Sequence, residues 1–156
     1  MKEKVAEIMD RDVITVHEND SVLDVAQVFK AKKIAGAPVL NDKEEVVGVI
    51  SEADILKILD DSHWYTPIFT ALYYLHLYGE GEEAHGIEQD VAKAHALKAK
   101  EIMSKDPQTV PPDALIDDAA QIMHATGFNR LPVVDETGTL RGIVTRADIL
   151  ASLYEH

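Results

Sequence analysis

The sequence lacks cysteine altogether, and it lacks the short motifs that most often signal catalysis or metal binding. Without cysteine, disulfide bonds, thiolate metal ligands and cysteine nucleophiles are excluded. The seven histidines show neither the H-x-x-x-H nor the H-E-x-x-H spacing of a zinc site, and no G-x-x-x-x-G-K-[ST] or G-x-S-x-G element is present. We therefore expect no metal site, no required cofactor and no enzymatic activity.

Positive charge and long apolar runs are also scarce. Lysine and arginine number 15 against 28 aspartates and glutamates, which gives a formal net charge of −13. Nucleic acids and anionic membranes are bound through clustered basic residues, so neither is an expected partner. The most apolar stretch, residues 64–78, is too short to cross a bilayer, and residues 1–4 do not resemble the start of a signal peptide. These features predict a soluble cytoplasmic protein.

What the chain does contain is an internal repeat. Residues 7–56 align without a gap onto residues 101–150, at a constant offset of 94 positions. The identical pairs include Glu7 and Glu101, Thr15 and Thr109, Pro38 and Pro132, Gly48 and Gly142, and Asp54 and Asp148. A unit of about fifty residues buries only roughly 60 % of its surface and is marginally stable alone. We therefore expect the two copies to pack about a pseudo-twofold axis, which creates paired clefts.

The pattern of apolar and turn-forming residues in each copy predicts the order strand, helix, strand, strand, helix. In the first copy the strands are expected at residues 13–16, 37–40 and 46–50. Ser21 is the expected N-cap of the first helix, and Asp113 is the expected N-cap of its counterpart. The apolar stripes of these helices are Val22, Val25, Ala26 and Phe29 in the first copy, and Ile116, Ala119, Ala120 and Met123 in the second. The pattern predicts an α/β (α+β) fold of two βαββα repeats.

The expected domains are a first repeat at residues 1–57, a helical linking segment at 58–97 and a second repeat at 98–156. The linking segment is rich in large apolar side chains, among them Trp64, Phe69 and Tyr78. Two alternatives remain open for it. It could cover an exposed apolar edge of the repeats, or it could form contacts between subunits of an oligomer.

The repeated motifs resemble those of the CBS (cystathionine-β-synthase) domain. Each copy contains h-x-T-V, an apolar helix, h-P-V-h-[ND] and G-h-h-[ST]-x-A-D-I-L, where h is apolar, in the same order. The resemblance implies a tandem CBS pair, or Bateman module, whose two clefts bind an adenosine-containing ligand such as AMP, ADP, ATP or S-adenosylmethionine. It also implies a regulatory protein that forms a homodimer and signals to a separate effector protein.

The S/T-x-x-D element that ends each repeat permits two interpretations. Ser51 with Asp54, and Thr145 with Asp148, match a capping box, in which hydroxyl and carboxylate satisfy backbone donors at a helix start. The same carboxylate offers two acceptor oxygens to the 2′- and 3′-hydroxyls of a ribose, and the helix N-terminus can face a phosphate. The two matched copies and the family resemblance favour ribose binding.

Two arginines of the second repeat are candidate phosphate ligands. By the resemblance, Arg130 lies where a basic residue often meets a phosphate, and a guanidinium suits that contact. Arg146 follows Thr145 in the first helical turn, where it could contact a phosphate or form a surface ion pair with Asp135 or Glu136. The first repeat has Gly36 and Glu52 at the two equivalent positions.

By analogy with the family, each cleft combines residues of both repeats. The stronger cleft is expected to hold the base near Ile14, Ile34 and Ala35, and the ribose and phosphate near Thr145, Asp148 and Arg130. The weaker cleft would combine Gln108, Phe128 and Asn129 with Ser51 and Asp54. The function predicted is an adenine-nucleotide sensor; the alternative is a dimerising interaction scaffold, in which the S/T-x-x-D elements serve only as caps.

Overall fold

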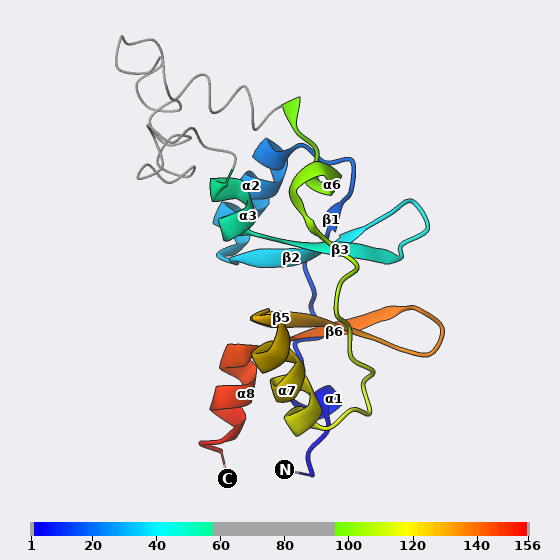
Figure 1. Cartoon of the computed structure of the whole chain (residues 1–156), viewed down its shortest axis with the longest axis vertical. Coiled ribbons are helices and arrows are strands. Elements are labelled where there is room, and N and C mark those ends of the chain that lie inside the picture. Colours follow the sequence, from blue (N-terminus) through cyan, green and yellow to red (C-terminus); the bar gives the residue numbers. More distant parts are fainter. Residues whose placement is uncertain (1, 58–95, 156) are drawn as a thin grey trace.

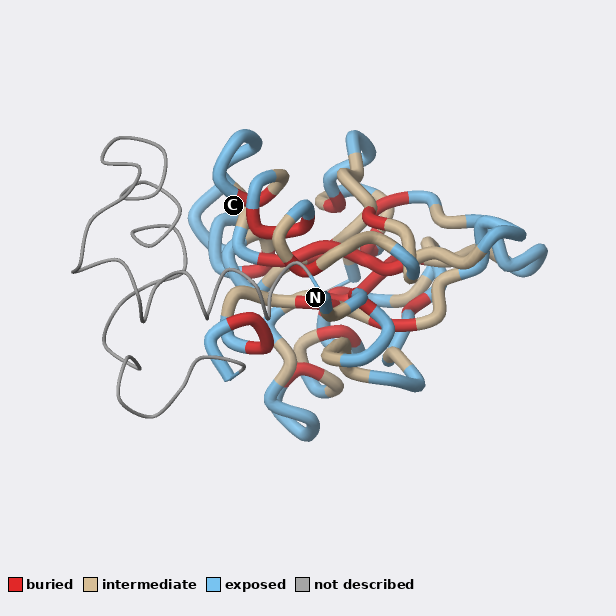
Figure 2. The backbone as a smooth tube through the Cα atoms, turned by 90° about the horizontal axis from the view of Figure 1, so that it is seen from above, coloured by how far each residue is buried: buried red, intermediate tan, exposed pale blue. Residues whose placement is uncertain are grey.

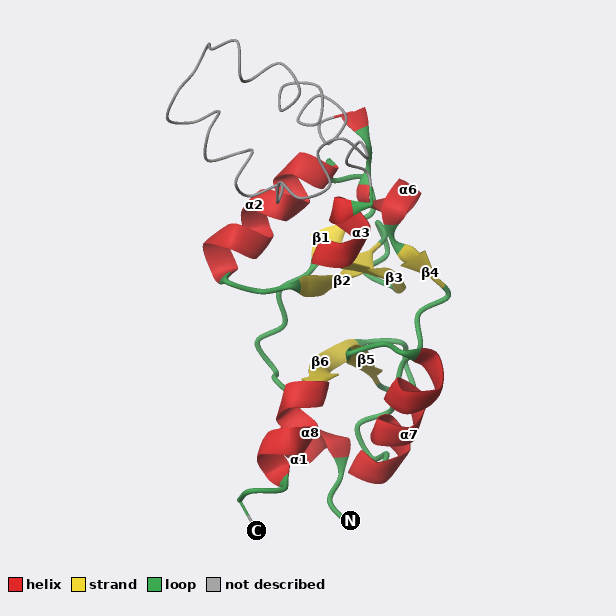
Figure 3. Ribbon diagram, turned by 60° about the vertical axis from the view of Figure 1, so that its left-hand side comes forward, coloured by secondary structure: helices red, strands yellow, loops and turns green. Residues whose placement is uncertain are grey.

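The computed structural model describes residues 2–57 and 96–155, and it consists of two stacked halves. In each half a sheet faces the middle of the molecule and helices cover the outer side (Figures 1 and 3). The predicted α/β class and the two repeats are confirmed. The predicted linking segment lies outside the described residues as far as residue 95.

The first half contains the strands β1 (Val16–His17), β2 (Gly36–Leu40) and β3 (Val46–Ser51), with the helices α2 (Val22–Lys32) and α3 (Glu52–Leu56). The second half contains β5 (Arg130–Val134), β6 (Leu140–Thr145), α7 (Ile116–Thr126) and α8 (Arg146–Ser152). β2 and β3 pair in the same antiparallel register as β5 and β6, with Pro38 opposite Val49 and Pro132 opposite Ile143. Of the predicted strand at residues 13–16 only Val16 belongs to β1, because the ladder with β2 pairs Val16 with Val39 and His17 with Leu40.

The two long helices begin at equivalent positions but are capped differently. Ser21 caps α2 as predicted, since its Oγ accepts the Asp24 N–H at 3.1 Å. The prediction of Asp113 as the cap of α7 is wrong. Asp113 lies in a turn in which the Ala114 N–H donates to the Pro111 carbonyl, and the helix begins after Leu115.

The first segment of each repeat packs into the half that the other repeat forms. Helix α1 (Val5–Ile8) lies against α8 and β6 of the second half, where the Val5 N–H donates to the Ala114 carbonyl at 2.8 Å (Figure 1). Helix α6 (Ala99–Ile102) and strand β4 (Ser104–Lys105) join the first half, and β4 pairs with β3. The two halves therefore exchange their first elements, which ties them together.

Each half has its own apolar core, to which the exchanged segment contributes. One core gathers Phe29, Ile50 and Ile55 with Ala99, and the other gathers Leu131 and Val133 with Val5 and Met9. Figure 2 shows the buried residues on the strands and on the inward turns of the helices. These cores fix the ends of β3 and β6, from which the candidate site is built.

Candidate functional site

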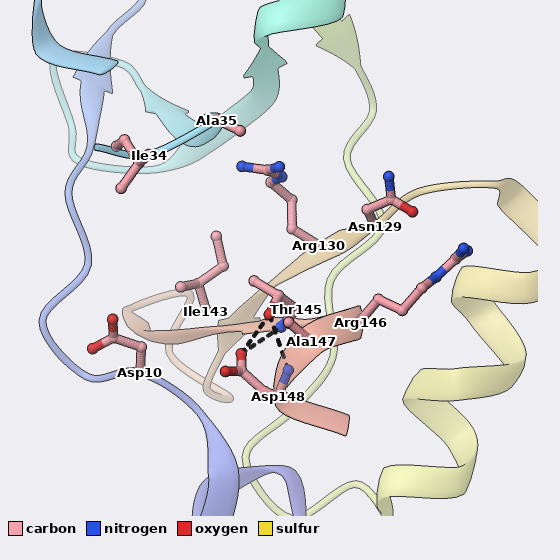
Figure 4. Close-up of a pocket in the computed structure, with 11 residues that line it drawn as sticks. Asp10, Ile34, Ala35, Asn129, Arg130, Ile143, Thr145, Arg146, Ala147 and Asp148 are labelled. Carbon is pink, nitrogen blue, oxygen red and sulfur yellow. Dashed lines mark hydrogen bonds between the residues drawn. The ribbon is translucent and has the colours of Figure 1, made fainter. Parts of the chain in front are cut away.

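A cavity of about 390 Å³ lies between the two halves, beside the junction of β6 and α8. Its lining brings together seven of the predicted site residues, namely Ile34, Ala35, Asn129, Arg130, Thr145, Arg146 and Asp148. Asn129 was predicted for the weaker cleft, and the structure places it in this one. Four further residues complete the lining: Asp10, Gly36, Ile143 and Ala147. Figure 4 shows Ile34 and Ala35 on the first half, facing Thr145 and Asp148 on the second. The cavity thus has the composite character that the sequence analysis predicted.

Thr145 and Asp148 form a complete capping box at the start of α8. The Thr145 N–H and hydroxyl both donate to Asp148 Oδ2, at 2.7 and 2.8 Å, and the Asp148 N–H donates to Thr145 Oγ1 at 3.2 Å (Figure 4). Within the described part of the chain, no hydrogen bond or ion pair is found at Asp148 Oδ1. The cap therefore uses one carboxylate oxygen and leaves the other as an acceptor beside the cavity.

Ser51 and Asp54 repeat this box at the start of α3, with one difference. Asp54 Oδ2 accepts the Ser51 N–H at 2.9 Å and the Ser51 hydroxyl at 3.1 Å. Its other oxygen, Oδ1, lies 3.7 Å from Lys57 Nζ, and the residue is only 9 % exposed. The carboxylate of the first repeat is therefore more enclosed than Asp148 and has a lysine near its second oxygen.

Arg130 reaches from the second half across to the first. Its guanidinium lies against the Cα of Gly36, where a Cβ would be 2.7 Å from Cζ and 2.9 Å from Nε of Arg130. Burial lowers the pKa of the Arg130 guanidinium, and the negative charge of Glu52 opposes that shift. A partly buried cation thus lies at the upper edge of the cavity (Figure 4).

Arg146 is exposed and lies at the edge of the cavity. Its backbone N–H donates to the Asn129 carbonyl at 2.8 Å, while its side chain extends away from Asp148 (Figure 4). The same residue lines a groove between α7 and α8, with Met123 and Ile149. Of the two carboxylates considered as its surface partners, Asp135 is bound by a different arginine, with Arg141 Nε at 2.6 Å from Oδ2.

The remaining predicted residues do not line this cavity. Ile14 is half-buried in the extended segment before β1, Gln108 is exposed, and Phe128 packs against the second core. Their assignment, like that of Ser51 and Asp54 to a second cleft, stays a prediction.

Sequence reasoning missed four lining residues, namely Asp10, Gly36, Ile143 and Ala147. Asp10 reaches the site only because the exchanged N-terminal segment pairs with Ile143 of β6. Gly36 could have been found from the repeat offset, because it is the position equivalent to Arg130.

The structure contains no cluster of three or more histidine, aspartate or glutamate side chains suited to a metal ion within residues 2–57 and 96–155. Over the same residues, no helix has the length and apolar character needed to cross a bilayer. The lining of the cavity offers a carboxylate acceptor, a guanidinium and apolar side chains.

Comparison with known proteins matches this architecture. The family model described as "CBS domain" matches residues 5–61 and 99–155. Protein MJ1426 of Methanocaldococcus jannaschii is 36 % identical over 156 residues, which cover 96 % of this chain and 90 % of that protein. Protein MJ1225 of the same organism is 29 % identical and covers 98 % of this chain, but the chain spans only 44 % of its length.

A solved structure resembles the whole chain. It is described as CBSX2 in complex with AMP, a protein of Arabidopsis thaliana. It has a TM-score of 0.71 and 27 % sequence identity, and the match covers 97 % of this chain and 96 % of that one.

Proposed function

Because the chain belongs to the CBS domain family, we propose that the cavity beside Asp148 binds an adenosine-containing nucleotide and that binding regulates a partner protein. The observation that carries this proposal is the Asp148 carboxylate. One of its oxygens closes the capping box and the other has no protein donor within the described residues. A ribose hydroxyl is the donor that such an acceptor suits.

The other residues that line the cavity support one orientation of the nucleotide. In this proposal the base lies against Ile34 and Ala35, with Ile14 nearby, and the ribose lies against Thr145 and Asp148. Arg130 then faces the phosphate, because a guanidinium is a strong partner for a phosphate oxygen. The AMP complex of CBSX2 supports AMP as the first ligand to examine. ADP, ATP and S-adenosylmethionine remain alternatives.

Regulation would follow from the two-part wall of the cavity. A ligand that contacts the first half through Ala35 and the second half through Asp148 favours the arrangement of halves that it fits best. Such a population shift changes the surface that an effector protein meets. The protein is proposed to act by binding rather than by catalysis, and turnover of a nucleotide during incubation would contradict this.

The scaffold alternative rests on a different surface. Leu150, Leu153 and Tyr154 are exposed on and just after α8, by 51 %, 53 % and 89 %. Leu150 also lines the groove between α7 and α8, with Met123 and Ile149. Exposed apolar side chains of this kind occur at protein interfaces, so this face is the proposed position of a homodimer or effector contact.

A thermal-shift panel separates the two functions. AMP, ADP, ATP and S-adenosylmethionine are each added to the protein, with GMP as the control nucleotide. A ligand at about 100 times its Kd adds about 2.7 kcal/mol to the free energy of unfolding, which raises Tm by roughly 5–10 °C for a chain of this size. A shift with an adenosine ligand and none with GMP supports sensing, whereas no shift with any of them favours the scaffold.

A further inference from the structure

Arg130 and Gly36 occupy equivalent positions of the two repeats, and they touch. The guanidinium lies where a Cβ of residue 36 would be, at 2.7 Å from Cζ. Two equivalent positions contact each other only near the axis that relates the repeats. The single guanidinium at these two positions therefore lies close to the pseudo-twofold axis, and Gly36 provides the space for it.

Glu52 is the first residue of α3, and it lies next to the backbone that the Arg130 guanidinium contacts. Gly36 pairs with Ser51 in the β2–β3 ladder, and the Glu52 N–H donates to the Ala35 carbonyl at 3.0 Å. These bonds hold Glu52 beside the backbone that contacts the guanidinium. The charge of Glu52 acts on Arg130, since it opposes the effect of burial on the arginine pKa.

The charge at this position is reversed between the repeats. Glu52 is half-buried at the start of α3, whereas its equivalent, Arg146, is exposed at the start of α8. Arg130 lines the cavity and Glu52 is not among the lining residues. A ligand in the cavity therefore contacts Arg130 directly, whereas Glu52 affects the ligand through its charge effect on the arginine.

We propose that Glu52 is a specificity-determining residue that competes with the anionic group of the ligand for Arg130. This inference rests on the proposed function of the cavity as an adenosine site. Glu52 and Arg130 form no ion pair within 4.0 Å in the described residues, so the charge of Glu52 acts on the guanidinium at longer range and opposes its movement toward a phosphate. An uncharged nucleoside has no phosphate, so its binding does not require Arg130 to move. Glu52 thus lowers the preference of the site for phosphorylated over unphosphorylated ligands, although it contacts neither.

The test measures the Kd of AMP and of adenosine by isothermal titration calorimetry, for the whole protein and for E52Q. We expect E52Q to tighten AMP binding by about two- to fivefold, the range for two charges that interact near a protein surface, and to leave adenosine binding unchanged. E136Q is the matched control, because it removes the same charge from an exposed turn of the second repeat. In an R130Q background, E52Q should no longer alter the ratio of the Kd of AMP to the Kd of adenosine.

Three results would overturn the inference. E52Q could change AMP and adenosine binding equally, it could change AMP binding no more than E136Q does, or its effect could persist without Arg130. Each of these leaves the adenosine site itself intact. If neither ligand binds the unmodified protein, the proposed function fails as well, so the two failures are distinguished by the adenosine measurement.

Discussion

Asp148 Oδ2 accepts two hydrogen bonds from Thr145, at 2.7 Å from the backbone nitrogen and 2.8 Å from the hydroxyl. The capping interpretation of this pair is therefore confirmed. It does not compete with the ribose interpretation, because a carboxylate has two oxygens and the cap occupies one of them. The same group can start a helix and still accept a ligand hydroxyl.

Replacing the two equivalent carboxylates should separate these roles. Both D54A and D148A remove a capping acceptor, which should lower the free energy of unfolding by about 0.5–2 kcal/mol in each case. D148A should also raise the Kd of the tighter adenosine site by about 10- to 100-fold, as expected for a hydrogen bond to a charged group. Urea unfolding and calorimetry measure the two effects. An equal loss of AMP binding in D54A and D148A would contradict the asymmetry of the clefts.

Substitution by alanine should have different effects at Gly36 than at Gly48 and Gly142. A Cβ on Gly48 or Gly142 would lie 2.8 Å from the backbone oxygen of Ser104 or Asp10, and close to a methionine sulfur. Overpacking against backbone costs about 1–3 kcal/mol, so G48A and G142A should unfold at lower urea concentration. A Cβ on Gly36 meets only the flexible end of Arg130 among its three nearest atoms. G36A should keep the stability of the protein. It should tighten AMP binding relative to adenosine, because the added Cβ displaces the guanidinium from the first half and from Glu52.

The glycine series has an internal check. If G36A acts only by displacing the guanidinium, G36A in an R130A background should leave AMP binding at the level of R130A alone. A difference in AMP binding between the double variant and R130A would show that Gly36 has another role.

The exchanged N-terminal segment should contribute to stability like any core element. Val5 is fully buried in the second core, although it lies only a few residues from the start of the sequence. V5A should lower the free energy of unfolding by about 1–3 kcal/mol, from lost burial and the space left behind. The exposed neighbour Lys2 supplies the control, since K2A should change urea unfolding by less than about 0.5 kcal/mol. Equal midpoints for the two variants would show that the exchange contributes little.

The β5–β6 hairpin should make stability depend on pH. Hydrogen bonds from Thr137 and Arg141 hold the pKa of Asp135 well below its ordinary value. The folded protein therefore keeps this carboxylate ionised more strongly than the unfolded chain does. Its stabilising effect is complete above the unfolded pKa, about 4, and is lost as pH falls toward the folded value.

D135N measures this contribution directly. At neutral pH it should unfold at lower urea concentration than the unmodified protein, and the difference should shrink below about pH 4. E136Q, one residue further along the same turn, should show no such narrowing. A difference that stays constant between pH 7 and pH 3 would rule out ionisation of Asp135 as the cause.

The repeat made most of the fold predictable. A constant offset implies that each element occurs twice, so a weak local pattern in one copy is supported by its counterpart. The exceptions arise where the copies differ. Ser21 is a strong cap, but the equivalent residue is Leu115, which has no polar side chain. The nearest preceding polar residue is Asp113, which a turn holds outside the helix. A partner strand likewise limits β1 to Val16–His17.

The sequence by itself determined the local chemistry of the site. The hydroxyl and carboxylate three residues apart form a capping box because only a few backbone angles at a helix start are involved. The tertiary structure alone decided which segments meet. Val5 and Asp10 join the second half, and Arg130 lies on Gly36, through contacts between residues far apart in the chain. Local periodicity carries no information about such contacts, because they depend on how the two halves pack.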